Sequence, residues 1–93
     1  MAIQSFRCKD TQAMFEGRRT RRFVNIETVA MRKLAMLHRA AALDDLRVPP
    51  NNRLEALQGD RAGQHSIRVN RQWRVCFVWL SAGPANVEIV DYH

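Results

Sequence analysis

The segment HSIRVNRQWRVCF, residues 65–77, restricts the fold of this chain more than any other stretch. Apolar and polar side chains alternate on both sides of Asn70–Gln72, which is typical of two strands in an antiparallel hairpin. A turn of only two residues would pair Val69 with Arg74 and mix apolar and polar side chains on both faces. A three-residue loop instead pairs Val69 with Trp73 and leaves one face mostly apolar, so we predict that register.

The predicted register brings two arginines together. The other pairs on the apolar face are Ile67 with Val75 and His65 with Phe77. On the opposite face, Arg68 then lies directly across from Arg74. Like charges in that position destabilise a sheet by up to about 1 kcal/mol unless an anion lies between them. A phosphate would be such an anion, whereas the alternative is that both guanidinium groups point into water or beside Glu55.

The last segment, VEIVDYH, can be placed by the same alternation. To keep the apolar face continuous, we pair Trp79 with Val87 and Phe77 with Ile89. Tyr92 then falls opposite Arg74 and shares a face with Arg68. By strict alternation Asp91 and His93 point to the other face, although a bend at the strand end would bring the His93 imidazole to the same site.

The first half of the sequence predicts helices. AIQSF alternates and indicates a short first strand, and a brief helix follows, capped by Asp10 or Thr11 and ending at Gly17. Apolar residues at three- and four-residue steps then predict a long helix from Asn25 to the region Leu43–Leu46. We expect His38, within this helix, to lie on or near the surface. The sequence Val-Pro-Pro at 48–50 cannot continue the helix.

The second half predicts consecutive strands with short connections. The predicted strands are RLEAL, HSIRV, WRVCFVW and VEIVDY, with SAGPAN as the loop before the last. Short connections favour antiparallel neighbours. We therefore predict a single α+β domain over residues 1–93, with helices packed on one face of a sheet.

Charge is the strongest compositional signal. The chain has 15 Lys+Arg against 9 Asp+Glu, a net charge of +6, and 13 of the 15 cations are arginine. The planar guanidinium group suits bidentate contacts to phosphate and stacking on bases, so nucleic acid is the favoured partner. Genomic base composition alone can also produce an arginine bias. The run at 18–22 is either a solvated loop or a surface that faces RNA.

Other functional classes receive little support. No window of about 18 apolar residues is present, and the N-terminus lacks a secretory signal core, so we expect a soluble, cytoplasmic protein without a membrane partner. Cys8 and Cys76 belong to no motif at metal-ligand spacing and are expected to be reduced and buried. We expect neither a metal nor a cofactor.

The predicted cluster suits RNA cleavage. Arginines neutralise a phosphate, a phenol donates a hydrogen bond or proton, and an imidazole titrates near pH 6.5. The 2′-OH of the substrate can be the nucleophile, and such a reaction needs a base and an acid but no metal. Glu55 is a further candidate for proton transfer or for orienting an arginine. Additional candidates for contacts to RNA phosphates are Arg53, Arg61 and Arg71.

Longer motifs carry a family resemblance. NRLEALQGDRAGQHSIRVNRQWRVCF, followed by VEIVDYH, resembles the HigB/GraT-type toxins of bacterial toxin-antitoxin modules, within the RelE superfamily. IQSF and VAMRKLAMLHRAAALDDLRVPP are similar as well. The resemblance implies a RelE-like fold, with two N-terminal helices against a curved, largely antiparallel sheet. It also implies active-site roles for Asp91, Tyr92 and His93, with Arg74 on the phosphate and Arg68 nearby.

The resemblance also implies an activity and partners. Such toxins are mRNA interferases that enter the ribosomal A site, cut translated mRNA and inhibit growth. Each is held inactive by an antitoxin with a helix-turn-helix DNA-binding domain, and operator DNA is reached only through that complex. This chain departs from the pattern at Glu55 and Gln58, where relatives often carry histidine and lysine in an LHPLKGD stretch. The loss of one proton-transfer group and one phosphate contact implies a slow toxin.

Two non-catalytic functions are the alternatives. The same basic face suits a protein that binds RNA or the ribosome without cleaving it. A purely structural subunit is the third interpretation, in which the arginines complement an acidic protein partner.

Overall fold

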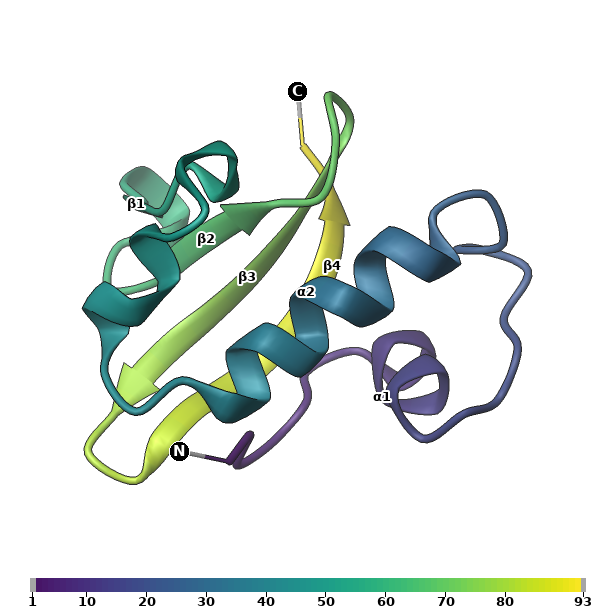
Figure 1. Cartoon of the computed structure of the whole chain (residues 1–93), viewed down its shortest axis with the longest axis horizontal. Helices are drawn as coiled ribbons and strands as arrows, with labels where there is room; N and C mark the ends of the chain where they lie inside the picture. Colours follow the sequence, from purple (N-terminus) through teal and green to yellow (C-terminus); the bar gives the residue numbers. More distant parts are fainter. Residues whose placement is uncertain (1, 93) are drawn as a thin grey trace.

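The computed structural model describes residues 2–92, which form two α-helices and a four-stranded sheet (Figure 1). The strands are β1 (Glu55–Ala56), β2 (His65–Arg68), β3 (Trp73–Leu80) and β4 (Gly83–Asp91). They lie in the order β1-β2-β3-β4, and every neighbouring pair is antiparallel. The predicted α+β fold is therefore confirmed, although the strand expected at RLEAL is only two residues long.

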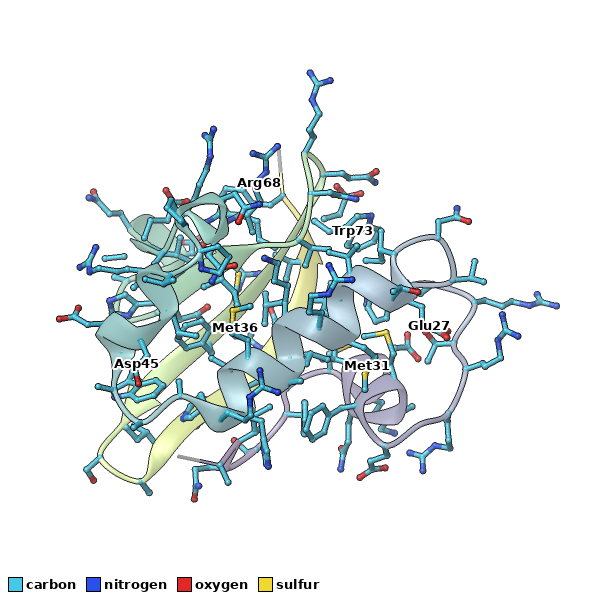
Figure 2. The ribbon with its side chains drawn as sticks, in the orientation of Figure 1. Glu27, Met31, Met36, Asp45, Arg68 and Trp73 are labelled. Carbon is cyan, nitrogen blue, oxygen red and sulfur yellow. The ribbon has the colours of Figure 1, made fainter. Side chains whose placement is uncertain are left out.

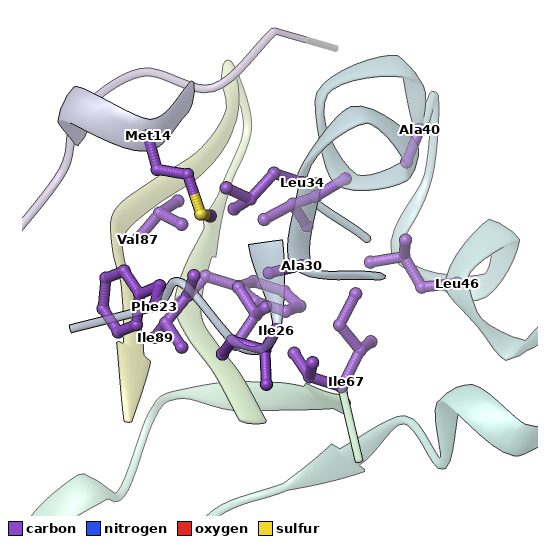
Figure 3. Packing of buried hydrophobic residues seen from close by; sticks show 14 residues of the cluster. Met14, Phe23, Ile26, Ala30, Leu34, Ala40, Leu46, Ile67, Val87 and Ile89 are labelled. Carbon is purple, nitrogen blue, oxygen red and sulfur yellow. The ribbon is translucent and has the colours of Figure 1, made fainter. Parts of the chain in front are cut away.

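Both helices pack against the same face of the sheet (Figure 1). Helix α1 spans Lys9–Phe15 and helix α2 spans Glu27–Arg39. Figure 3 shows how their apolar side chains meet those of the strands in one core. The main contributors are Met14 from α1, Ala30, Leu34 and Leu37 from α2, and Ile67, Val75, Phe77, Val87 and Ile89 from the sheet. Burying side chains of this size provides about 1.5–3 kcal/mol each, so the helices fix which sheet face stays accessible.

The second helix is shorter than predicted. It ends at Arg39 because Ala40 is extended, and a separate 3₁₀ helix, η1, follows at Leu43–Arg47. The Asp45 carboxylate accepts hydrogen bonds from the backbone N–H groups of Ala41 and Ala42, at 2.9 and 3.1 Å. These bonds satisfy the backbone outside a helix, which is the usual competition that Asp offers. A single helix to Leu43–Leu46 was therefore a wrong prediction.

The β2–β3 hairpin has the predicted register. His65 pairs with Phe77, Ile67 with Val75, and Arg68 with Arg74. The loop holds its shape because Asn70 Oδ1 accepts hydrogen bonds from the backbone N–H groups of Gln72 and Trp73, both at 2.8 Å. The two arginines are therefore opposed on the face of the sheet that the helices leave free.

From Trp73 to Cys76 the β3–β4 register differs from the prediction by two residues, and beyond the irregularity Trp79 pairs with Pro84 rather than Val87, a shift of three. Ile89 pairs with Val75 rather than Phe77, and Val90 rather than Tyr92 lies opposite Arg74. β4 begins at Gly83, directly after a tight turn, and includes most of the segment predicted as a loop. A shift of two residues keeps every side chain on its predicted face, so Tyr92 still lies on the side of Arg74.

Two features explain the longer β4. One is an irregularity: the pairs Cys76–Glu88 and Val78–Ala85 enclose one more residue on β4 than on β3. Asn86, with φ of 52°, is the extra residue and forms a β-bulge. The other is Pro84, which lacks a backbone N–H. Its carbonyl points away from β3 and accepts a hydrogen bond from the backbone N–H of Gln4. Because the nitrogen of Pro84 points the same way, the proline removes no hydrogen bond between β4 and β3.

The N-terminal segment runs along the free edge of β4. Its backbone bonds join Gln4 N to Pro84 O, Val87 N to Ser5 O and Arg7 N to Val87 O, at 2.7–3.1 Å. A single parallel bridge pairs Phe6 with Val87. The predicted first strand is thus reduced to one isolated bridge, because the bulge interrupts the regular edge of β4.

His38 anchors the start of this segment. Its Nδ1 accepts a hydrogen bond from the backbone N–H of Ile3 at 3.2 Å, and its ring lies 5.3 Å from that of Phe15. The residue is half-buried, in agreement with a position near the surface. Within residues 2–92, no helix is long and apolar enough to cross a membrane.

One buried hydrogen bond joins α1 to β4 and provides a test of the fold. Thr11 is fully buried, and its Oγ1 accepts the backbone N–H of Ile89 at 3.0 Å. Thr11→Val keeps the shape but leaves that N–H unpaired, so we expect a loss of about 1–3 kcal/mol in the free energy of unfolding. Urea denaturation measures it. Thr28→Val, at an exposed position on α2, is the matched control and should change stability little.

Candidate active site

An arginine-lined hollow lies on the sheet face opposite the helices, at the end where β2 stops. Figure 2 shows Arg68 at this end of the sheet, close to the end of β4. The hollow has a volume of about 320 Å³. Its lining consists of Arg53, Arg68, Asn70, Arg71, Arg74 and Tyr92. Four of these six side chains carry a positive charge, so the hollow suits an anion.

Arg74 is the fixed group of the hollow. Its residue is only 9% exposed. Nε donates a hydrogen bond to Ser66 Oγ, and Nη2 donates one to the backbone carbonyl of Arg53, both at 2.7 Å. Nη2 also lies 3.5 Å from Glu55 Oε1. Among residues 2–92, no partner is seen for Nη1, so these contacts orient the guanidinium group while leaving donors for a ligand.

Tyr92 and Arg68 flank this guanidinium group. The ring of Tyr92 is centred 5.8 Å from Arg74 Cζ, and its backbone N–H donates to Gln72 O at 2.7 Å. That bond holds Tyr92 beside the hairpin loop although it follows the last residue of β4. Arg68 Nε donates to Asn70 O at 3.1 Å. Arg68 takes part in no ion pair within the described range, so its charge is available to an anion.

Three other residues predicted for the site, Glu55, Asp91 and Arg61, are not among the residues that line the hollow. Glu55 contacts Arg74 at its edge, as described above. Asp91 pairs with Trp73 and accepts a hydrogen bond from Gln72 Nε2 at 3.0 Å, which places it outside the lining. Arg61 also lies outside the lining, because its guanidinium group pairs with Glu88 at 2.9 Å. His93 falls outside the described residues.

The arginine run at 18–22 forms no part of this hollow. Arg18 pairs with Glu16 at 2.8 Å. The guanidinium group of Arg22 lies 5.1 Å from the ring centre of Phe23 and 5.9 Å from that of Trp73. A separate hollow of about 410 Å³ is lined by Arg19, Thr20, Arg21 and Val24. Contact of this run with RNA stays a prediction.

Two residues of the site were not singled out from the sequence. Ser66 anchors Arg74, and it could have been found because it lies on the same face as Arg68, two residues away. Asn70 lines the hollow through its place in the hairpin loop, and a residue of that type at a loop start suggests only a turn. Within residues 2–92, no group of three or more His, Cys, Asp or Glu side chains is arranged to hold a metal ion.

Comparison with known proteins shows the class of protein to which this chain belongs. It is a RelE-like toxin of a type II toxin-antitoxin system, since the family model with that description matches residues 4–93. Within this class the chain belongs to the HigB-like toxin family. The resemblance inferred from the sequence motifs is thereby confirmed.

Two relatives illustrate the similarity. Toxin HigB-1 of Vibrio cholerae is 40% identical over 88 residues, which cover 92% of both chains. An uncharacterized protein of Haemophilus influenzae is 42% identical over 53 residues, which cover 57% of this chain and 52% of the relative. Toxins of this class have an antitoxin as partner.

The two cysteines test how closed the sheet face is beside the hollow. Both are free, and Cys76 is fully buried whereas Cys8 is half-buried, not buried as predicted. Burial raises the pKa of the Cys76 thiol, and the nearby Arg61 and Arg74 oppose this only in part. At neutral pH, a smaller fraction of Cys76 is therefore thiolate than for a solvent-exposed cysteine. We expect iodoacetamide to label Cys8 at least tenfold faster than Cys76, as followed by peptide mass spectrometry, on the order expected when only rare opening exposes a thiol.

Unfolding in urea is the control for this labelling. Both thiols should then react at similar rates. Equal rates in the folded protein would contradict the closed packing between β2, β3 and β4.

Proposed function

We propose that this toxin is a metal-independent endoribonuclease that cleaves translated mRNA in the ribosomal A site. The observation that carries the proposal is the hollow, where a buried, oriented Arg74 lies beside Tyr92 and opposite Arg68. A scissile phosphate placed there would relieve the repulsion between the two arginines. It would also meet donors that need no reorganisation, which is the most effective form of charge stabilisation.

In the proposed reaction the 2′-oxygen of the RNA attacks the adjacent phosphorus. The bond from phosphorus to the 5′-oxygen breaks, giving a 2′,3′-cyclic phosphate and a 5′-hydroxyl end. A base removes the proton from the 2′-OH, and an acid returns one to the 5′-oxygen. Arg74 and Arg68 neutralise the charge that develops on the non-bridging oxygens. Arg53 and Arg71 hold the flanking phosphates.

The proton-transfer groups of the proposal are Tyr92, His93 and Glu55. The assignment is best supported for Tyr92, because its ring lies beside the guanidinium group of Arg74. Glu55 lies 3.5 Å from Nη2 of the same guanidinium group and either transfers a proton or orients the arginine. In this proposal Asp91 acts through Gln72 at the end of the hairpin, and Arg61 contributes to the positive field rather than to the hollow.

The proposal includes the partners and the place of action. The mRNA substrate is presented by the ribosome, so the enzyme acts in the cytoplasm and inhibits translation and growth. The antitoxin carries a helix-turn-helix DNA-binding domain and brings the toxin to operator DNA.

Induced expression followed by mapping of mRNA 5′ ends tests the activity. Wild-type protein should arrest growth and create new 5′ ends within translated regions. Arg74→Ala removes the oriented cation and should lower the cleavage rate about 10²–10³-fold. Tyr92→Phe removes the phenol hydroxyl and should lower the rate about 100-fold. A variant without residues 91–93 should be inactive.

Arg47→Ala is the matched control, because Arg47 is exposed in η1 and pairs only with Asp44 in the described range. It removes the same charge at a distance and should cleave normally. Growth arrest with unchanged mRNA would refute the nuclease. A protein that binds RNA without cleaving it would lose its effect in Arg74→Ala and keep it in Tyr92→Phe.

A further inference from the structure

The backbone turn before β1 holds the guanidinium group of the site. Arg53, the last residue of this turn, accepts a hydrogen bond from Arg74 Nη2 on its carbonyl oxygen at 2.7 Å. Its own backbone is left-handed, with φ of 47° and ψ of 55°. L-residues with long side chains rarely adopt that conformation, and such backbones persist where their surroundings fix them. The neighbouring residue, Asn52, makes the contacts that can fix this turn.

Asn52 is the anchor of the turn. It is fully buried in the 3₁₀ helix η2 (Pro50–Asn52). Its Nδ2 donates to the carbonyl oxygens of Leu46 and Val48, at 3.1 and 3.4 Å. Its Oδ1 accepts a hydrogen bond from Lys33 Nζ at 2.6 Å. Nδ2 also lies 3.1 Å from Met36 Sδ. Both ends of the amide are engaged, so only one orientation of the side chain satisfies all four partners.

Lys33 ties the anchor to the core. It extends from α2, is only 7% exposed, and makes no ion pair with any carboxylate in residues 2–92. Burial, with a smaller contribution from Arg32, lowers the pKa of its amine. A lysine that served only solubility would extend into water. Its hydrogen bond is instead made to Asn52, next in sequence to Arg53.

We propose that Asn52 and Lys33 are positioning residues of the active site, which fix the carbonyl of Arg53 and through it the guanidinium group of Arg74. The chain of contacts runs from α2 through the buried amide to the turn, and from the turn to Arg74. The effect on cleavage rests on the proposed function, whereas the effect on Arg74 does not.

Loss of the anchor has a specific consequence at the hollow. If the carbonyl of Arg53 is displaced, the only remaining partner of Nη2 in residues 2–92 is the carboxylate of Glu55, which lies 3.5 Å away in the wild-type structure. The guanidinium group is then free to turn about its remaining bond to Ser66 and to close that ion pair. A carboxylate bound to Arg74 competes with a phosphate for the same donors. The site therefore loses anion affinity without losing any arginine.

The experiment compares Asn52→Ala and Lys33→Met with Thr11→Val. All three remove a buried hydrogen bond, but that of Thr11 joins α1 to β4 and has no part in the turn. Each variant is studied under conditions where urea denaturation shows it fully folded. The readouts are the Nε–H NMR signal of Arg74, identified by its loss in Arg74→Lys, titration with inorganic phosphate, and single-turnover cleavage of mRNA on programmed ribosomes.

The proposal predicts a moved and broadened Nε–H signal of Arg74 in Asn52→Ala and Lys33→Met. Phosphate affinity should fall about tenfold, and the cleavage rate constant about 10–100-fold, as for a small misplacement of a catalytic group. Apparent affinity for the ribosome should change less than twofold, because Arg71 and Arg68 remain. Thr11→Val should leave all of these near wild type.

An unchanged Nε–H signal, or losses no larger than those of Thr11→Val, would overturn the positioning role. If Asn52→Ala does not fold, Lys33→Met alone decides, because it keeps the bonds of Asn52 to Leu46 and Val48. If wild-type protein cleaves no mRNA, the proposed nuclease fails. The NMR signal and phosphate titration still decide whether Asn52 and Lys33 position Arg74.

Discussion

The direct opposition of Arg68 and Arg74 across β2 and β3 is the constraint around which the free face of the sheet is organised. Two guanidinium groups in adjacent strands repel each other, and one of them is almost completely buried. A buried charge is tolerated only where hydrogen bonds replace its lost hydration. The bonds to Ser66 Oγ and Arg53 O do this, and the exposed carboxylate of Glu55 contributes little at 3.5 Å. The result is a rigid cation with donors that no residue of the range 2–92 uses.

The opposite face of the same strands supplies the rigidity. Ile67 and Val75 alternate with the arginines and are buried under the helices. Because successive side chains point to opposite faces, movement of Arg74 along its strand would require these core residues to move as well. Helix α2 thus contributes twice, through its apolar residues beneath the strands and through Lys33 beneath the turn.

The sequence allowed the β2–β3 register to be predicted because the loop length and the alternation restrict it jointly. The β3–β4 register was wrong because Gly83, Pro84 and Asn86 are turn-forming residues, and alternation does not reveal a bulge that inserts a single residue. The face of Tyr92 was nevertheless predicted, since an error of two residues preserves it. The carbonyl of Arg53 has no sequence signal at all, because any residue supplies a carbonyl and only the path of the backbone decides where it lies.

The contact between the N-terminal segment and β4 has a consequence for the order of synthesis. Residues 4–7 leave the ribosome well before their hydrogen-bond partners Pro84 and Val87, which lie about 80 residues later in the chain. Val87 and Ile89 are also needed to close the hydrophobic core, so the fold cannot be completed while β4 is still being translated. Tyr92 reaches the hollow later still. The sheet and its contact with residues 4–7 are therefore completed only after β4 has been synthesised.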